Sequence, residues 1–212
     1  MAFNELDSEG DEVTQCIDYH RNISCNQYIP EQLKHLSNIK NCSFLHLNIR
    51  SLNKHHDDLV DFLTNTGCNF DVIGCSETWL NDRSYTDILN LNGYKLFTKN
   101  RCGRSGGGVC LYISSTYNVN ICDDIVIADN HSDFLFVEIS GKSRKNLIIG
   151  VIYRPPDADL EIFRAKLEEA LFSINNKNKS CILLGDFNID LSRDNTAKND
   201  FNITLFILLP HD

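Results

Sequence analysis

Four short apolar runs, each ending at a polar side chain, constrain the fold of this chain more than any other feature. The runs FLHL, DVIGCS, LIIGVI and CILLG lead into Asn48, Glu77, Tyr153 and Asp186 in turn. Apolar runs of this length are typical of buried strands. If the four ends lie on one side of a sheet, they and the nearby Asn188 form a mouth with two carboxylates, two amides and a phenol. Ligand sites in α/β sheets are common at such strand ends.

Helical patterns alternate with these runs and predict an α/β fold. Residues 53–67 and 157–176 repeat apolar side chains at helical spacing, and Asp157 or Asp159 can cap the second segment. Shorter helices are expected over 30–39 and from residue 197, and further strands over 94–100, 106–114, 119–128 and 133–140. In the last of these strands apolar and polar residues alternate, which predicts a half-buried strand. Strands before and after helices in mixed order predict layers with both parallel and antiparallel pairs.

Composition suits a globular chain outside the membrane and the secretory route. The 212 residues are 42% hydrophobic, enough for a substantial core in one large domain or two small ones. No apolar run is long enough to span a membrane, and the N-terminus lacks the apolar stretch of a signal peptide. We therefore expect a nuclear or cytoplasmic protein that is not secreted and has no membrane partner. The sequence indicates no protein partner.

Charge is concentrated at the N-terminus. Net charge is −9, which argues mildly against tight binding to nucleic acid. Residues 1–18 hold six acids and no Lys or Arg, so the remainder carries 20 basic and 23 acidic residues. We expect these first 18 residues to be disordered, within an acidic and partly disordered segment over residues 1–41.

Nine cysteines occur without a metal-binding or disulfide pattern. Their number is odd, and no Cys-x-x-Cys pair is present. Several lie inside apolar runs, where Cys behaves as a small hydrophobe. We interpret them as reduced and mostly buried, with zinc ligation as the minor alternative.

The polar residues that follow the runs suit metal-assisted chemistry. Singly, Asn and Asp are also ordinary turn formers at the end of a strand. Jointly, Glu77 could bind a hard cation such as Mg²⁺, and Asp186 could orient or deprotonate a water. Asn48 and Asn188 could hold water or phosphoryl oxygens, and the Tyr153 hydroxyl could donate to developing charge. The set predicts metal-assisted phosphodiester hydrolysis.

Five motifs carry a family resemblance. LHLNIRSL, SETWL, GGGVCLYI, VIYRPP and GDFNIDL resemble, in order and spacing, the endonuclease/exonuclease/phosphatase family. The match looks closest to the apurinic-like endonuclease domain of LINE-type (non-LTR) retrotransposons, over about residues 42–201. The resemblance implies a four-layer α/β sandwich with two mixed β-sheets flanked by helices. It also implies a Mg²⁺ (or Mn²⁺) site and a DNA phosphodiester backbone as substrate.

The resemblance also implies a role for each candidate residue. Asn48 matches the first-strand Asn near the metal, and Glu77 matches the metal-binding Glu. Tyr153 looks like the Tyr that contacts the scissile phosphate. Asp186 resembles the Asp that positions the water, and Asn188 the Asn that stabilises the transition state. These roles rest on the match of motifs and not on spacing alone.

Two arginines match positions that contact the substrate backbone, and one family motif is missing. Arg104, with the glycines at 106–108, and Arg154 resemble backbone-contacting positions, although SGGG also suits a hairpin turn. The family's Ser-Asp-His strand has no counterpart, because His211-Asp212 has the wrong order. Four other histidines lie in segments unrelated to this motif, and we interpret them as core or surface residues: His46, His55, His56 and His131.

The missing motif sets the functional expectation. We expect residues 42–212 to form a domain of this family that lacks its C-terminal strands. Because catalytic groups act as a set, losing a His can cost several orders of magnitude in rate. We therefore expect a DNA-nicking endonuclease by descent with weak or no activity. The alternatives are a non-catalytic remnant and a phosphatase branch of the same fold.

Overall fold

The structure is a computed structural model, and it describes residues 15–18, 23–26, 42–101, 106–125, 131–140 and 146–189. The chain divides into two compact units, which are described separately. One unit comprises Met1–Cys42 and Asp58–Asn69, and the other comprises Ser43–Asp57 and Phe70–Asp212. The helices predicted over 30–39 and from residue 197 lie outside the described residues.

The first unit contains a two-stranded antiparallel sheet. Strands β1 (Gln15–Asp18) and β2 (Ile23–Asn26) pair with Gln15 opposite Asn26. Residues 15–18 therefore form a strand where the sequence predicted disorder, because pairing between short polar segments leaves no hydrophobic signal. Helix α2 (Leu52–Thr66) starts in the second unit and ends in the first, with non-helical backbone angles at His55. It confirms the helix predicted over 53–67.

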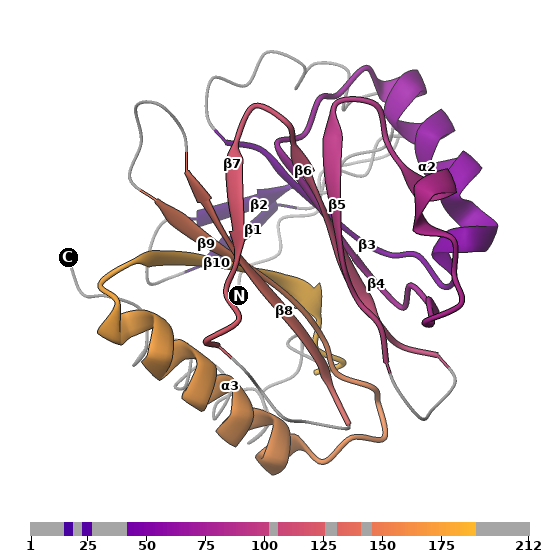
Figure 1. Ribbon diagram of the computed structural model, residues 1–212. Helices are drawn as coiled ribbons and strands as arrows, with labels where there is room; N and C mark the ends of the chain where they lie inside the picture. The colour runs from indigo at the N-terminus through magenta and orange to yellow at the C-terminus, as the bar shows by residue number, and fades with distance from the viewer. Residues whose placement is uncertain are drawn as a thin grey trace. The chain divides into compact units, whose positions relative to one another are not determined.

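The second unit is built on two mixed four-stranded sheets (Figure 1). One sheet has the order β3-β4-β6-β5, formed by β3 (Phe44–Asn48), β4 (Val72–Ser76), β6 (Val109–Ser114) and β5 (Tyr94–Lys99). The other has the order β10-β9-β8-β7, formed by β10 (Ser180–Asp186), β9 (Leu147–Tyr153), β8 (Asp133–Ser140) and β7 (Asn118–Ile121). The β3–β4 and β10–β9 pairs are parallel and the others antiparallel. A short 3₁₀ helix, η2 (Thr86–Leu89), precedes β5.

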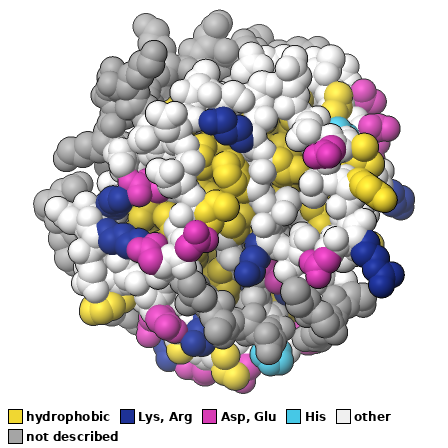
Figure 2. Space-filling view, viewed as in Figure 1, with side chains coloured by type: hydrophobic (Ala, Val, Ile, Leu, Met, Phe, Trp, Pro, Cys, Tyr) yellow, Lys and Arg dark blue, Asp and Glu magenta, His cyan; other side chains and the backbone are white. Residues whose placement is uncertain are grey.

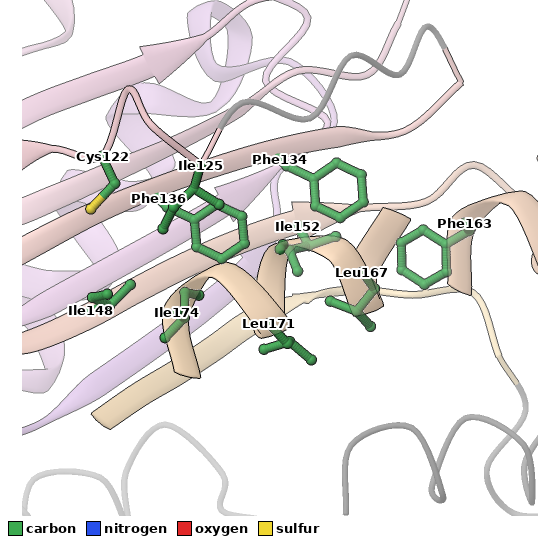
Figure 3. Packing of buried hydrophobic residues seen from close by; sticks show 11 residues of the cluster. Cys122, Ile125, Phe134, Phe136, Ile148, Ile152, Phe163, Leu167, Leu171 and Ile174 are labelled. Atoms are coloured by element: carbon green, nitrogen blue, oxygen red, sulfur yellow. The ribbon is translucent and has the colours of Figure 1, made fainter. Parts of the chain in front are cut away.

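Helix α3 (Leu160–Asn176) covers one face of the second sheet. Asp159 caps it, because its Oδ1 accepts a hydrogen bond from the Ile162 backbone N–H at 2.9 Å. The buried stripe of the helix faces aromatic and aliphatic side chains of β8 and β9, as Figure 3 shows. The cluster contains Cys122, Ile125, Phe134, Phe136, Ile148, Ile152, Phe163, Leu167, Ala170, Leu171 and Ile174.

A second apolar cluster fills the space between the two sheets. Val72 and Leu111 from the first sheet pack with Val137 and Val151 from the second. Strand β8 therefore has α3 on one face and a sheet on the other, and nearly all its residues are buried. The strand predicted over 133–140 is confirmed, but the prediction that it is half-buried is wrong. Even the polar residue that opens it, Asp133, is buried, because it forms an ion pair.

The edges of the two sheets meet beside the strand ends. Strand β10 lies against β3 and β4 of the facing sheet. A Cβ atom added at Gly185 would lie 2.2 Å from the Ile152 carbonyl oxygen of the paired strand, so only glycine fits there. Gly185 thus allows β10 to pair with β9 up to Asp186, the last residue of the strand. Strand β7 is shorter than predicted: it ends at Ile121, and residues 126–130 lie outside the described part.

Within residues 42–189 six cysteines are free thiols: Cys42, Cys68, Cys75, Cys110, Cys122 and Cys181. Cys75 of β4 and Cys110 of β6 lie opposite each other in the sheet. A hydrogen bond to Cys75 and burial raise the pKa of Cys110. Among the described residues, no helix is both long and apolar enough to cross a membrane. The predicted α/β class is confirmed, with two mixed four-stranded sheets and helices.

Candidate active site

Asn48 joins the ends of the two facing sheets. Its Nδ2 atom donates to Glu77 Oε1 at 2.7 Å and to Asp186 Oδ2 at 2.8 Å. An amide nitrogen carries two N–H bonds, so one can go to each carboxylate. Both acidic oxygens therefore lie within one hydrogen-bond length of the same nitrogen. Asn48 ends β3, Asp186 ends β10, and Glu77 follows β4, so three separate strands contribute to this group.

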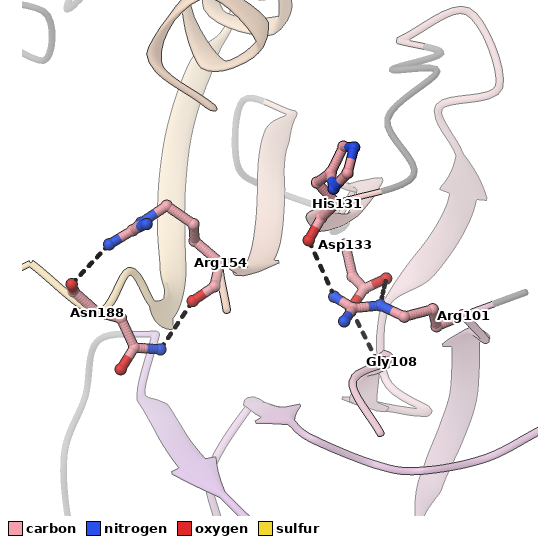
Figure 4. A network of polar contacts seen from close by, with 6 residues as sticks. All are labelled: Arg101, Gly108, His131, Asp133, Arg154 and Asn188. Carbon is pink, nitrogen blue, oxygen red and sulfur yellow. Dashed lines mark hydrogen bonds and ion pairs between the residues drawn. The ribbon is translucent and has the colours of Figure 1, made fainter. Parts of the chain in front are cut away.

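Arg154 fixes the loop that follows β10. Its guanidinium donates to the carbonyl oxygens of Phe187 at 2.8 Å and Ala158. It also donates to the Asn188 carbonyl oxygen at 2.7 Å (Figure 4). Asn188 returns a bond from Nδ2 to the Arg154 carbonyl at 2.7 Å, and its backbone N–H donates to Asp186 Oδ1 at 3.2 Å. Arg154 is buried, and that burial lowers the pKa of its guanidinium. In this structure Arg154 holds the Asn188 loop, and direct contact with substrate stays a prediction.

Tyr153 interacts with Glu77 and stays protonated at neutral pH. Burial, followed by the charge of Glu77 and a hydrogen bond to it, raises the pKa of Tyr153 to about 12. Its phenol is therefore a hydrogen-bond donor throughout the physiological range. The Arg101 guanidinium lies 5.5 Å from the centre of the Tyr153 ring, within the range of a cation–π contact.

A second arginine, Arg101, was not predicted from the sequence, and its largely buried side chain supports the opposite side of this group. Arg101 pairs with Asp133 through Nε at 3.1 Å and a terminal nitrogen at 2.5 Å, and the Gly108 N–H donates to the same carboxylate at 2.8 Å. Figure 4 shows this contact and the bond from Arg101 to the His131 carbonyl. The pair fastens the β5–β6 hairpin to the start of β8. The only signal in the sequence was an acid that opens a strand whose next four residues are apolar.

Backbone strain is concentrated in the loops of this region. Positive φ angles occur at Arg50 (44°), Ser51 (89°), Glu77 (54°), Trp79 (54°) and Asn188 (49°). Such angles cost roughly 1–3 kcal/mol per residue outside glycine and persist where the surroundings enforce them. Here the Ser51 and Leu52 N–H groups donate to the Glu77 and Thr78 carbonyls, both at 2.8 Å. Strain that is held in place at one end of a sheet is typical of a functional site.

His46 is a further group near the carboxylates. It lies two residues before Asn48 on β3, so both side chains leave the same face of the strand. Its Nε2 atom is buried and has no hydrogen-bond partner in the described part of the chain. Burial lowers the pKa of His46, and the nearby Asp186 charge opposes this effect. Sequence reasoning assigned His46 to an unrelated segment, although its two-residue spacing from Asn48 was an available signal.

Some predicted positions are not described or serve the fold. Arg104 and His211-Asp212 lie outside the described residues. The glycines at 106–108 belong to the hairpin between β5 and β6, and all three have positive φ angles. Gly107 and Gly108 accept hydrogen bonds from the Trp79 and Thr78 N–H groups at 2.8 and 3.1 Å. This segment therefore fits the hairpin-turn interpretation and also braces the residues after Glu77.

The donor set fits a hard divalent cation. Glu77 and Asp186 offer carboxylate oxygens, and Asn48 adds an amide beside them. Mg²⁺ prefers oxygen ligands and commonly takes one or two carboxylates, with water and phosphate completing its shell. Within the described ranges no group of three His, Cys, Asp or Glu side chains could hold a metal ion. The arrangement suits Mg²⁺ or Mn²⁺, whereas a structural zinc site needs four nitrogen or sulfur ligands.

Comparison with known proteins identifies the family of this chain. The model of the endonuclease/exonuclease/phosphatase family matches residues 41–202. The chain therefore belongs to this family, as the motifs predicted. No curated protein sequence matches the chain.

Solved structures show the same fold at low sequence identity. The endonuclease domain of TRAS1, a telomere-specific non-LTR retrotransposon, aligns with a TM-score of 0.60 and 14% identity, over 79% of this chain and 71% of that one. An AP endonuclease of Leishmania major aligns with a TM-score of 0.61 and 15% identity, over 77% of this chain and 66% of that one. The 3′ phosphatase NExo of Neisseria, bound to a product DNA hairpin, aligns with a TM-score of 0.52 and 16% identity, over 79% of this chain and 71% of that one.

Proposed function

We propose that this chain is a metal-dependent phosphodiesterase that nicks DNA, of the kind found in non-LTR retrotransposons. The observation that carries the proposal is the convergence of Glu77 and Asp186 on the Asn48 amide. Two carboxylates on one neutral donor form an anionic group that a divalent cation would neutralise. Its position at the ends of three strands leaves it open to a long substrate, since Asn48 and Asn188 are exposed.

Each residue has a role in this proposal. Glu77 and Asp186 would hold the ion, which polarises a phosphoryl oxygen when bound. Tyr153 stays protonated and can donate its phenolic hydrogen to charge developing on the phosphate. The backbone N–H of Asn188 orients the Asp186 carboxylate. Arg154 keeps Asn188 in place through its carbonyl contacts, so it is a positioning residue.

DNA is the proposed substrate, and we place the protein in the nucleus or cytoplasm. Two of the similar structures are endonucleases and the third contains DNA, which supports a nucleic-acid substrate. The six free thiols suit a reducing compartment. We expect slow turnover, because the 212 residues contain no Ser-Asp-His motif to supply the His of the family. A phosphatase acting on a phosphate monoester is the second candidate, because the Neisseria relative is a 3′ phosphatase.

Plasmid nicking tests the proposal together with metal binding. We expect Mg²⁺-dependent conversion of supercoiled plasmid to the nicked form, abolished by chelator and reduced about a hundredfold or more in Glu77→Gln and Asp186→Asn. Because the rate is low, Mn²⁺ binding measured by electron paramagnetic resonance provides a second readout. Both variants should bind the ion more weakly.

Glu169→Gln is the matched control, since this carboxylate is exposed on α3 and pairs only with Lys166 among the described residues. It should change neither nicking nor Mn²⁺ binding. Faster phosphate release from a 3′-phosphorylated oligonucleotide than nicking of plasmid would favour the phosphatase instead. A wild-type chain that binds no Mn²⁺ would contradict both candidates.

A further inference from the structure

Trp79 combines exposure with a backbone conformation that a bulky side chain rarely adopts. Its φ angle is 54°, and its side chain keeps 45% of its surface exposed. Isolated exposed apolar residues are common on proteins, but a large residue with positive φ is an outlier. Exposure of the indole to water does not stabilise this conformation. The contacts of the surrounding fold therefore hold Trp79 in a backbone conformation that it otherwise disfavours.

The surroundings hold Trp79 firmly. Its backbone N–H donates to the Gly107 carbonyl at 2.8 Å, and the preceding Thr78 N–H donates to Gly108 at 3.1 Å. A Cβ atom added at Gly106 would lie 3.7 Å from the indole Nε1, so the edge of the ring rests against that glycine. The hairpin that carries these glycines is itself fastened to β8 by Asp133. The ring is thus both exposed and preorganised.

Trp79 lies at the right separation from the proposed metal site to contact a neighbouring nucleotide. It is two residues after Glu77, and two residues of chain span at most about 7 Å. Successive base pairs of DNA are about 3.4 Å apart along the axis. A strand whose phosphate lies at Glu77 and Asp186 can therefore bring a base one or two nucleotides away within reach of Trp79.

We propose that Trp79 is a nucleobase-stacking residue beside the scissile phosphate. The neighbouring strained loop presents Arg50, which is exposed, and the two loops are joined by the Ser51 N–H bond to the Glu77 carbonyl. Trp79 supplies a face for a base, and Arg50 supplies a cation for the adjoining phosphate.

Nucleic acid is favoured as the partner because of the chemistry of this surface. Stacking accepts any base, because every base has a π face. On the face shown in Figure 2, Lys and Arg side chains are scattered among acidic ones and do not form one continuous patch. With a net charge of −9, phosphate contacts alone would bind DNA weakly, so a stacking contact contributes a large share of the affinity. This inference rests on the proposed function.

The experiment uses the fact that Trp79 is the single tryptophan of the chain. A short DNA with phosphorothioate linkages is titrated in Mg²⁺, and binding is followed both by Trp79 fluorescence and by anisotropy of a dye on the DNA. We expect saturable quenching that weakens when an abasic spacer replaces the base next to the cleavage position. Trp79→Leu should bind about five- to a hundredfold more weakly, whereas Trp79→Phe should retain most of the affinity. Phe172→Leu, an exposed aromatic on α3, is the control and should bind like the wild type.

The outcomes separate this inference from the proposed function. DNA binding with quenching but without metal-dependent nicking supports the stacking role and counts against the phosphodiesterase. DNA binding without any change in Trp79 fluorescence, or undiminished affinity in a folded Trp79→Leu protein, overturns the stacking role alone. Failure to bind DNA at all overturns both. Circular dichroism of each variant shows that it is folded.

Discussion

Two regions of the molecule differ in composition and packing: the face of the β10-β9-β8-β7 sheet beneath α3, and the strand ends that carry the candidate active site. Beneath α3 the side chains are apolar, closely packed and joined to regular strands and a capped helix. At the strand ends, polar and charged side chains meet, and Glu77 and Asn188 have positive φ angles. Apolar packing in the first region stabilises the fold, whereas the strained backbone and closely spaced carboxylates of the second region destabilise it. Substitutions in the two regions should therefore affect different properties.

The largest expected effect is on the stability of the α3 side. Leu167 is fully buried, so Leu167→Ala should lower the free energy of unfolding by about 3–4 kcal/mol through lost burial and a cavity. Phe172→Ala on the same helix is the control, and because Phe172 is 61% exposed it should change this free energy by less than about 0.5 kcal/mol. Urea denaturation measures both. Equal losses would show that α3 is not anchored by its buried stripe.

Breaking the Arg101–Asp133 pair should have the next largest effect on stability. Both side chains are below one tenth exposed, so Asp133→Asn leaves the Arg101 charge buried without its counter-ion. We expect a loss of about 3 kcal/mol in unfolding free energy, at the lower end for a broken buried ion pair because Asn keeps a hydrogen-bond acceptor. The exposed Lys166–Glu169 pair is the matched control, and Glu169→Gln should cost at most about 0.5 kcal/mol.

A double variant refines this prediction. Replacing Arg101 and Asp133 together by Leu removes both charges, so it should cost less than the sum of the two single changes. Additive losses in urea denaturation would mean that the two side chains act independently, contrary to their contact.

The contrast between the regions also explains what the sequence could predict. The strands, α3 and its Asp159 cap follow local patterns, and the polar ends of four apolar runs pointed to the residues now found together. The Arg101–Asp133 pair joins residues 32 positions apart, and no local pattern reports such a contact. The burial of β8 on both faces depends on a second sheet whose placement a single strand cannot reveal.

His46 provides a smaller, pH-dependent test at the boundary of the two regions. Burial lowers its pKa below the ordinary 6.5, so on acidification the unfolded chain binds a proton before the folded protein does. His46 therefore reduces stability as the pH falls below about 6.5, and the loss stops at its lower folded pKa. His46→Gln should be relatively more stable at pH 5.5 than at pH 7.5, compared with the wild type. Subtracting the two proteins cancels the carboxylates that they share, and a difference independent of pH would contradict the effect.

The smallest effect is spectroscopic and concerns a single proton at the strand ends. After burial, the charge of Glu77 and its hydrogen bond are the next causes that raise the pKa of Tyr153 to about 12. Glu77→Gln removes the charge but keeps an acceptor, so the phenol should ionise at lower pH, nearer to its ordinary value of about 10. Ultraviolet difference spectra between this variant and Glu77→Gln/Tyr153→Phe isolate the one phenol. Ionisation of Tyr153 should not affect stability at neutral pH, because Tyr153 is protonated there in both the folded and the unfolded chain. An unaltered ionisation would mean that Glu77 does not contribute to the raised pKa of Tyr153, and that it is not close enough to act on the phenol that the proposed chemistry uses.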